Sequence, residues 1–169
     1  TERPILEPGI MESLINDTDT FFSSGEFYKQ NKIPHKRGIL VIGAPGTGKT
    51  TWSKYYLGKM KNTFGIVIDC STAYFGVGMS TYFRAMFGTR PKVLVLEDVD
   101  GVTGGYGSGR SAFLNFIDGP SELSNTLILA TTNYPERLDP AILDRPSRFD
   151  SIVYIGQPSE PLRREFLLR

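Results

Sequence analysis

The chain has 169 residues, of which 40% are hydrophobic and 22% charged, and its formal net charge is +1. This length suits one domain with a substantial core, and the composition excludes an intrinsically disordered chain. The near-zero charge gives no support to a nucleic-acid or membrane surface. The sequence also lacks a signal peptide and an apolar stretch of about 18 residues, so no membrane association is indicated.

A single cysteine, Cys70, excludes an internal disulfide and favours the cytoplasm or another reducing compartment. It lies in the apolar run GIVIDCS, which favours a buried thiol over a catalytic one. The sequence begins abruptly at Thr1 and ends in a helix-like stretch, as a fragment would. Organellar targeting therefore stays open.

The predicted elements alternate between helices and short apolar strands. A helix is expected over residues 9–22, with Ile10, Leu14 and Phe21 on one face. Apolar runs without alternation are typical of strands buried on both faces of a parallel sheet, and their alternation with helices predicts an α/β sandwich. A mobile loop is expected over the glycine-rich residues 101–109. In chain order, the strands are expected at 38–42, 65–68, 93–96, 126–130 and 152–155, and further helices at 50–60, 80–87 and 111–117.

A phosphate-binding loop follows the first predicted strand. Residues 43–50 read GAPGTGKT, which matches G-x-x-x-x-G-K-[ST] between a strand and a helix, as the motif requires. Glycines bring backbone N–H groups close to phosphate oxygens, and the helix N-terminus adds its dipole. Lys49 would reach the β- and γ-phosphates, and Thr50 would offer its hydroxyl to Mg²⁺. The predicted nucleotide-binding residues are Gly43, Ala44, Pro45, Gly46, Thr47, Gly48, Lys49, Thr50 and Thr51.

Two adjacent carboxylates end the third predicted strand, in the sequence VLVLEDVD. The carboxyl end of this strand is expected beside the phosphate loop, where one acid would hold Mg²⁺ and the other would activate water. By position, Glu97 is assigned to the metal, together with Thr50, and Asp98 to the water. Asp is one methylene shorter than Glu, so the two roles could be shared or exchanged. Asp100 is interpreted as a loop or cap residue.

The fourth strand ends in a further polar residue, Asn133. An amide that donates and accepts suits the positioning of a water, and Asn before Tyr-Pro is also a common turn former, so both interpretations stay open. Arg145 and Arg148 lie three apart in LDRPSRFD. Each would either stabilise charge on a transferring phosphoryl group, in cis or from a neighbouring subunit, or form a surface ion pair.

Taken in order, these stretches resemble the AAA clade of AAA+ ATPases, from about Pro8 to the end of the chain. GAPGTGKT resembles Walker A, VLVLEDVD resembles Walker B, and TLILATTNYPERLDPAILDRPSRFD resembles the second region of homology. The resemblance implies Asn133 as sensor 1, with Arg145 and Arg148 as arginine fingers toward the next subunit. Many members carry Asp before Glu, so the order Glu97–Asp98 is a departure.

Within the clade, the LEDVD order and the lead-in FYKQNKIPHKRG are similar to the mitochondrial ATPase that translocates the Rieske protein and to its bacterial relatives. The lead-in makes residues 25–33 candidates for the adenine pocket. Tyr74, Phe75 and Gly76 fall where the clade has its pore loop, although core packing is the alternative for the two aromatic residues.

The whole chain, residues 1–169, is thus interpreted as a large nucleotide-binding subdomain, with a helical lead-in at 1–37 and a P-loop core at 38–169. The expected fold is a P-loop NTPase αβα sandwich with a five-stranded, mostly parallel sheet. The small helical lid of the clade would follow Arg169 and is absent from this sequence.

The resemblance implies ATP and Mg²⁺ as cofactors and hydrolysis that drives remodelling, unfolding or translocation of a polypeptide. The active form would be a homo-oligomeric ring, for example a hexamer. A nucleic-acid motor or clamp loader is one alternative, although no basic stripe supports it. A non-hydrolysing structural subunit is the other, supported by the altered acidic order.

Overall fold

The computed structural model describes residues 3–73, 75, 78–103, 108–119, 123–143 and 148–168. Its centre is a five-stranded sheet in the order β2-β3-β4-β1-β5, and every pair is parallel. The predicted α/β fold with a parallel sheet is confirmed. The strands are β1 Lys36–Gly43, β2 Phe64–Asp69, β3 Lys92–Glu97, β4 Thr126–Thr132 and β5 Ser151–Ile155.

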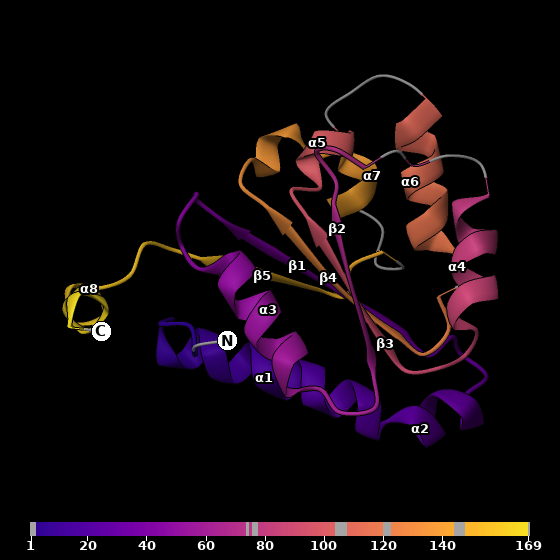
Figure 1. The fold of residues 1–169 in the computed structure, drawn as a ribbon, viewed down its shortest axis with the longest axis horizontal. Helices are drawn as coiled ribbons and strands as arrows, with labels where there is room; N and C mark the ends of the chain where they lie inside the picture. Colours follow the sequence, from indigo (N-terminus) through magenta and orange to yellow (C-terminus); the bar gives the residue numbers. More distant parts are fainter. Residues whose placement is uncertain are drawn as a thin grey trace.

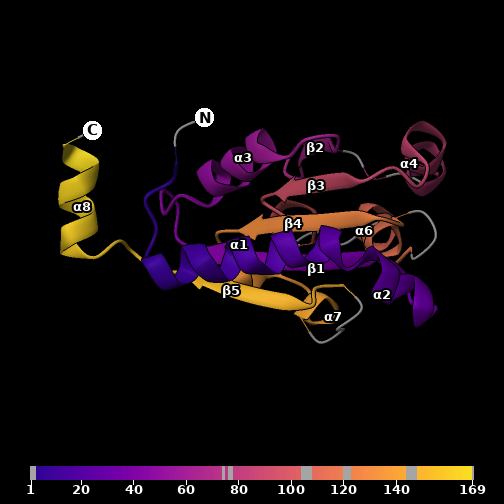
Figure 2. The same cartoon turned by 90° about the horizontal axis from the view of Figure 1, so that it is seen from below.

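Helices cover both faces of the sheet, which Figure 1 shows nearly edge-on. Helices α1 and α3 lie on one face, and α4 and α6 lie on the other, while α8 stands apart from both layers (Figures 1 and 2). The helices are α1 Pro8–Ser23, α2 Gly25–Gln30, α3 Lys49–Lys59, α4 Met79–Phe87, α5 Asp100–Thr103, α6 Ser108–Asp118, the 3-10 turn η1 Pro135–Arg137, α7 Pro140–Leu143 and α8 Glu160–Leu167. None of these described helices is long and apolar enough to cross a membrane.

Alternation along the three inner strands divides the core in two. In β1, Ile39 and Val41 pack with Trp52 of α3 and Leu14 of α1, whereas the intervening Leu40 faces the other layer. This second layer is rich in aromatic rings from α4 and α6, and Phe83 packs edge-on against Phe116. Because both faces of β1, β3 and β4 are covered, their sequences read as continuous apolar runs.

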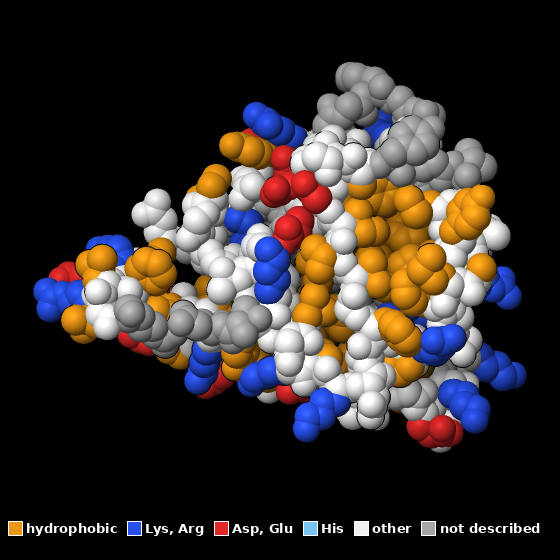
Figure 3. Space-filling model, viewed as in Figure 1, with side chains coloured by type: hydrophobic (Ala, Val, Ile, Leu, Met, Phe, Trp, Pro, Cys, Tyr) orange, Lys and Arg blue, Asp and Glu red, His pale blue; other side chains and the backbone are white. Residues whose placement is uncertain are grey.

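The two outer strands differ from the prediction of strands buried on both faces. In β2, Phe64 and Val67 are exposed, and in β5 Ile152 and Tyr154 are exposed. Figure 3 shows a broad apolar area between β2 and α4, a helix whose Tyr82 and Met86 are also exposed. The apolar runs predicted the strands correctly, but composition alone does not separate an edge strand from an inner one.

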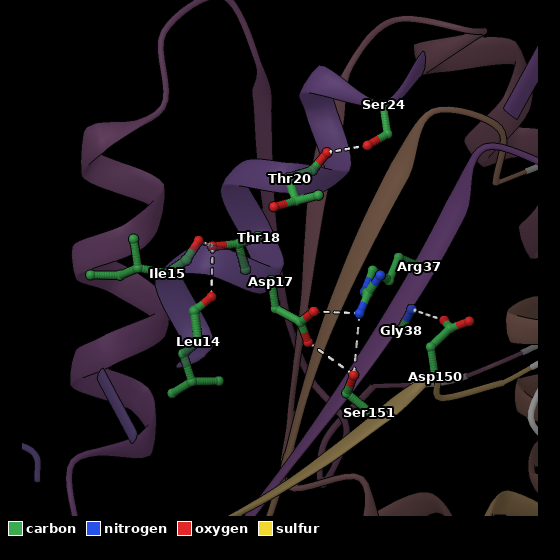
Figure 4. A network of polar contacts seen from close by, with 10 residues as sticks. All are labelled: Leu14, Ile15, Asp17, Thr18, Thr20, Ser24, Arg37, Gly38, Asp150 and Ser151. Carbon is green, nitrogen blue, oxygen red and sulfur yellow. Dashed lines mark hydrogen bonds and ion pairs between the residues drawn. The ribbon is translucent and has the colours of Figure 1, made fainter. Parts of the chain in front are cut away.

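Helix α1 is joined to β1 and β5 by a polar network (Figure 4). Asp17 pairs with Arg37 on β1 and accepts a hydrogen bond from the Ser151 hydroxyl on β5 at 2.9 Å. Of the face predicted for this helix, Leu14 and Phe21 are buried, whereas Ile10 is only partly covered. The helical lead-in therefore packs as part of the sandwich.

A mobile loop is expected over the glycine-rich residues 101–109, but both ends of this segment are helical. Residues up to Thr103 belong to α5, and α6 begins at Ser108. Residues 104–107 lie outside the described part of the chain. The loop prediction is wrong for both ends of the segment, where helix formation prevails over glycine content.

Strand register brings the predicted site residues to one edge. Ile42 of β1 is level with Thr132 of β4, and Asp69 of β2 is level with Glu97 of β3. Because all strands are parallel, the residues that follow them meet at the carboxyl edge of the sheet. The phosphate loop, the acidic pair and Asn133 all lie there.

Candidate nucleotide site

The phosphate loop runs from the end of β1 to the start of α3. Gly46 and Gly48 have φ angles of 80° and 95°, in the left-handed region where a side chain is strained. A Cβ at Gly43 would lie 2.4 Å from the carbonyl oxygen of Ile155, so only glycine fits beside β5. Inside the loop, the Thr47 hydroxyl donates to the Ala44 carbonyl at 2.9 Å. The loop is therefore held in shape by its own sequence.

Lys49 is the first residue of α3 and its ammonium group is buried beneath the loop. It donates to the carbonyl oxygens of Gly43 and Ala44 at 2.7 and 2.9 Å, and to Oδ1 of Asn133 at 2.7 Å. Burial lowers the pKa of Lys49 from its usual value, while the nearby carboxylates of Asp98 and Asp100 act in the opposite direction. A positive charge held in this way is prepared for an anion.

Asn133 links this lysine to the acidic pair. While its Oδ1 accepts from Lys49, its Nδ2 donates to Oδ1 of Asp98 at 2.8 Å. Asp98 itself has a φ of 52°, which is uncommon for a residue other than glycine and costs on the order of 1 kcal/mol. Asp98 lines the same hollow as the phosphate loop. The Lys49 ammonium, the Asn133 amide and the Asp98 carboxylate are thus connected by hydrogen bonds in one continuous row.

Glu97 differs from its neighbour, because it lies at the end of β3 and not in the row. Its Oε1 atom is buried and has no hydrogen-bond partner among the described residues. A buried carboxylate oxygen without a partner is costly, so the site is suited to a cation or a metal-bound water. A carboxylate from Glu97 and a hydroxyl from Thr50 are ligand types that Mg²⁺ prefers beside phosphates, but only Thr50 lines the hollow at this edge of the sheet.

Behind the row lies a buried polar pair that sequence reasoning missed. The Thr132 hydroxyl donates to Oδ1 of Asp100 at 2.6 Å and accepts from the Tyr134 N–H at 3.1 Å. These contacts fix the backbone on both sides of Asn133. Asp100 begins α5, in agreement with its interpretation as a loop or cap residue, but its partner Thr132 on β4 has no local signal in the sequence.

The carboxyl edge opens into a hollow of about 690 Å³. Its polar side is the phosphate loop with Asp98 and Asn133, and its other side is largely apolar. This second side is contributed by the segment before α1 and by α8, through Pro4, Ile5, Pro158, Leu162, Arg163, Phe166 and Leu167. One polar and one apolar side suit a ligand with a charged tail and a flat ring.

Comparisons with known proteins agree with this geometry. The family described as "ATPase family associated with various cellular activities (AAA)" matches residues 39–157. The chain belongs to the AAA ATPase family. It is 31% identical over 176 residues to the "Probable mitochondrial chaperone bcs1" of Schizosaccharomyces pombe, covering 98% of this chain and 38% of that protein. The predicted membership of the AAA clade is confirmed.

Two further relatives show how much of each protein the chain represents. It is 28% identical to "Mitochondrial chaperone BCS1" of Danio rerio, covering 92% of this chain and 40% of the relative. It is 35% identical to "ATP-dependent zinc metalloprotease FtsH" of Akkermansia muciniphila, covering 87% of this chain and 20% of the relative. The chain therefore spans less than half the length of these AAA relatives.

The segment predicted to form the adenine pocket, residues 25–33, does not lie beside the phosphate loop. Residues 25–30 form α2, and a Cβ built on its Gly25 would lie 3.5 Å from Cε1 of His35, next to the beginning of β1. That is the amino edge of the sheet, opposite the phosphate loop (Figure 1). This position contradicts the adenine-pocket role that the resemblance of the lead-in implied for residues 25–33.

The two arginines of the AAA signature have different outcomes. Arg145 lies outside the described residues, so its predicted role as an arginine finger stays a prediction. Arg148 is 3% exposed, and its Nε and Nη2 donate to the two carboxylate oxygens of Asp118 at 2.8 and 2.6 Å. The surface ion pair considered for Arg148 is thus a buried one.

The backbone of Arg148 lies beside Gly38, whose added Cβ would meet the Arg148 carbonyl oxygen at 2.2 Å. Five residues of β1, at about 3.3 Å each, separate Gly38 from the phosphate loop. This distance of about 16 Å is beyond the reach of a side chain, so Arg148 does not act on the phosphates of its own chain. A role toward a neighbouring subunit stays a prediction.

The predicted pore loop is only partly described. Tyr74 and Gly76 lie outside the described residues. Phe75 is 2% exposed and packs edge-on against Phe113, with 5.0 Å between ring centroids. The core-packing alternative therefore holds for Phe75, and an exposed role for this ring is contradicted.

Proposed function

We propose that this chain binds ATP with Mg²⁺ and hydrolyses it, as the motor domain of a ring-shaped homo-oligomer that remodels a polypeptide. The observation that carries the hydrolytic part is the row from Lys49 through Asn133 to Asp98. Phosphate contact at one end of this row is transmitted to the carboxylate at the other. A carboxylate that can accept a proton from water, joined through one amide to the phosphate-binding lysine, is what hydrolysis needs beyond binding.

Each residue of the site has a role in this proposal. The phosphate loop and Lys49 bind the β- and γ-phosphates, and Thr50 and Glu97 hold the metal. When bound, Mg²⁺ would neutralise part of the negative charge of the phosphates. Asp98 accepts the proton of the attacking water, and Asn133 orients that water beside it. The apolar side of the hollow receives the base.

Family membership supports the ring and the polypeptide substrate. Two relatives carry the name of a chaperone and one that of an ATP-dependent protease, and each of those names implies action on proteins. We expect ATP to favour an oligomer in sedimentation velocity, and a protein that stays monomeric at all concentrations with ATP would contradict the ring.

The decisive variant for hydrolysis is Asp98→Asn. It keeps the shape of the side chain and removes the base, so steady-state ATPase activity of the oligomer should fall by about a hundredfold or more. Binding of ATP, measured in parallel by calorimetry, should remain. Asp19→Asn, an exposed substitution of the same kind on α1, is the matched control and should leave activity unchanged.

Three outcomes separate the alternatives. Unchanged turnover in Asp98→Asn would move the base to Glu97 or elsewhere. Absence of turnover in the unmodified oligomer, with ATP bound, would favour the non-hydrolysing structural subunit. Loss of binding together with turnover would show that Asp98 holds the ligand and does not act as a base.

A further inference from the structure

The segment before α1, residues 3–7, forms a strap across the phosphate loop. Pro4 and Leu6 of this strap are buried, and a Cβ on Gly48 would lie 3.4 Å from Cδ2 of Leu6. The strap lines the nucleotide hollow on one side. On its other side, toward α1 and α8, lies a second hollow of about 280 Å³. Leu6 anchors the strap in the apolar core, while Pro4 and Ile5 line both hollows and form a thin wall between them.

Helix α8 contributes the opposite part of the same wall. Leu162 and Phe166 line the nucleotide hollow, although the helix stands apart from the two layers of the sandwich (Figure 2). Phe166 is 70% exposed, so α8 is not seated in the apolar core. A wall built on such a helix needs an attachment to keep its place.

A hydrogen bond from the backbone of Ser159 to the side chain of Glu7 joins the two halves of the wall. Oε1 of Glu7, at the end of the strap, accepts from the backbone N–H of Ser159 at 3.1 Å. Ser159 is the N-cap residue of α8, and its own side chain makes no capping hydrogen bond. A carboxylate at this position also interacts favourably with the positive end of the helix dipole. The contact therefore fixes both where α8 begins and how close it lies to the strap.

We propose that Glu7 is a positioning residue for the nucleotide base. By joining the strap to α8, it holds Ile5 and Leu162 at the spacing that encloses the base, without contacting the ligand itself. This inference rests on the proposed nucleotide site. Phosphate binding does not depend on Glu7, because the phosphate loop is held by its own contacts. Loss of the contact should thus weaken only the part of the affinity that comes from the base.

Two variants remove the two partners of this hydrogen bond independently. Glu7→Ala deletes the acceptor. Ser159→Pro deletes the donor, and the φ of −59° at Ser159 already suits proline. Glu7→Gln keeps an acceptor oxygen and serves as the conservative rescue. Glu26→Ala, an exposed substitution on α2 at the other edge of the sheet, is the matched control.

Calorimetric binding of Mg·ATP is compared with that of Mg·inorganic triphosphate, which lacks the base. In Glu7→Ala and Ser159→Pro, the Kd for ATP should rise by about five- to tenfold, while the Kd for triphosphate stays within about twofold. Glu7→Gln and Glu26→Ala should remain near the unmodified protein for both ligands. Circular dichroism melting of each variant reports whether the fold is intact.

An equal rise for both ligands would show a general loss of structure and overturn the inference. Unchanged ATP binding in both disrupting variants would overturn it as well. If the unmodified protein bound neither ligand, the proposed nucleotide function itself would fail. That result is distinct from normal binding that is insensitive to Glu7.

Discussion

Two buried lysines lie at opposite ends of the same sheet. Lys49, at the carboxyl edge, donates to two carbonyl oxygens and to the Asn133 amide. Lys92, at the amino edge, donates to the carbonyl oxygens of Gly88, Arg90 and Ser124 at 2.7–3.0 Å. Burial lowers the pKa of both lysines. Partner number and pKa direction therefore do not distinguish a ligand-binding lysine from a structural one.

Access and neighbouring charge distinguish them. Lys49 borders the nucleotide hollow, and the carboxylates of Asp98 and Asp100 partly offset its burial. Lys92 is fully buried, and only desolvation acts on its pKa. At the amino edge, the Lys92 ammonium group connects two turns through its hydrogen bonds and is shielded from solvent. At the carboxyl edge, the same residue types face a hollow that a phosphate chain can enter.

The largest expected effect concerns Cys70, just beyond the carboxyl end of β2. Burial, with smaller effects from the surrounding carboxylates, raises the pKa of this thiol from 9.0 to about 12. At pH 8, iodoacetamide should label the native protein about a thousandfold more slowly than the urea-unfolded chain, because only the thiolate reacts. Cys70 is the sole cysteine, so the mass shift is unambiguous.

The labelling experiment tests whether the carboxyl edge of the sheet is closed to small reagents outside the nucleotide hollow. Labelling rates within about tenfold of each other would show that β2 opens readily and would contradict the buried thiol. The raised pKa of Cys70 also makes the stability of the folded state depend on pH. Above pH 9 the folded state keeps a proton that the unfolded chain loses, so Cys70 makes folding less favourable as the pH rises toward 12.

The next effect concerns the ion pair between Arg148 and Asp118 near the amino edge. The guanidinium side chain is 4% exposed and the carboxylate side chain 30%. Asp118→Ala should therefore cost about 3 kcal/mol in urea unfolding, because it leaves a buried cation, whereas Arg148→Met should cost about 1–2 kcal/mol. Binding of ATP by the folded variants should not change. A larger loss of stability in Arg148→Met than in Asp118→Ala, or weakened ATP binding in either variant, would contradict a purely structural role for this ion pair.

A smaller effect is expected for Lys92→Met, which conserves volume and leaves three carbonyl groups without their donor. Because three carbonyl groups lose their charged donor, the expected loss of stability is about 1–2 kcal/mol. The midpoint and slope of urea unfolding measure it. A variant as stable as the parent would show that the buried charge contributes nothing net, as some buried ionic groups do.

The sequence predicted those parts of the structure that depend on neighbours along the chain. Strands followed from apolar runs such as GILVI, and the phosphate loop followed from its glycines and the strand and helix around it. The acidic pair and Asn133 were predicted to meet at one edge, because parallel strands align their ends. The row from Lys49 to Asp98 agrees with that expectation.

The remaining features depend on contacts between distant residues, and no local pattern marks them. Glu7 and Ser159 are separated by 152 positions, and Arg148 and Asp118 by 30. Neither partner looks unusual in its own segment. The burial of Phe75 likewise depends on Phe113 from another helix. Sequence reasoning identified which residue types matter but not which of them the fold would pair.

The most direct test of the nucleotide site is calorimetric binding of Mg·ATP to Lys49→Met, with Lys54→Met as control. Both substitutions lie on α3 and remove one positive charge, but Lys54 is exposed. We predict that Lys49→Met weakens binding by about a hundredfold or more and that Lys54→Met leaves it unchanged. Equal affinities in the two variants would show that the buried lysine at the carboxyl edge does not bind phosphate, and would contradict the assignment of the site.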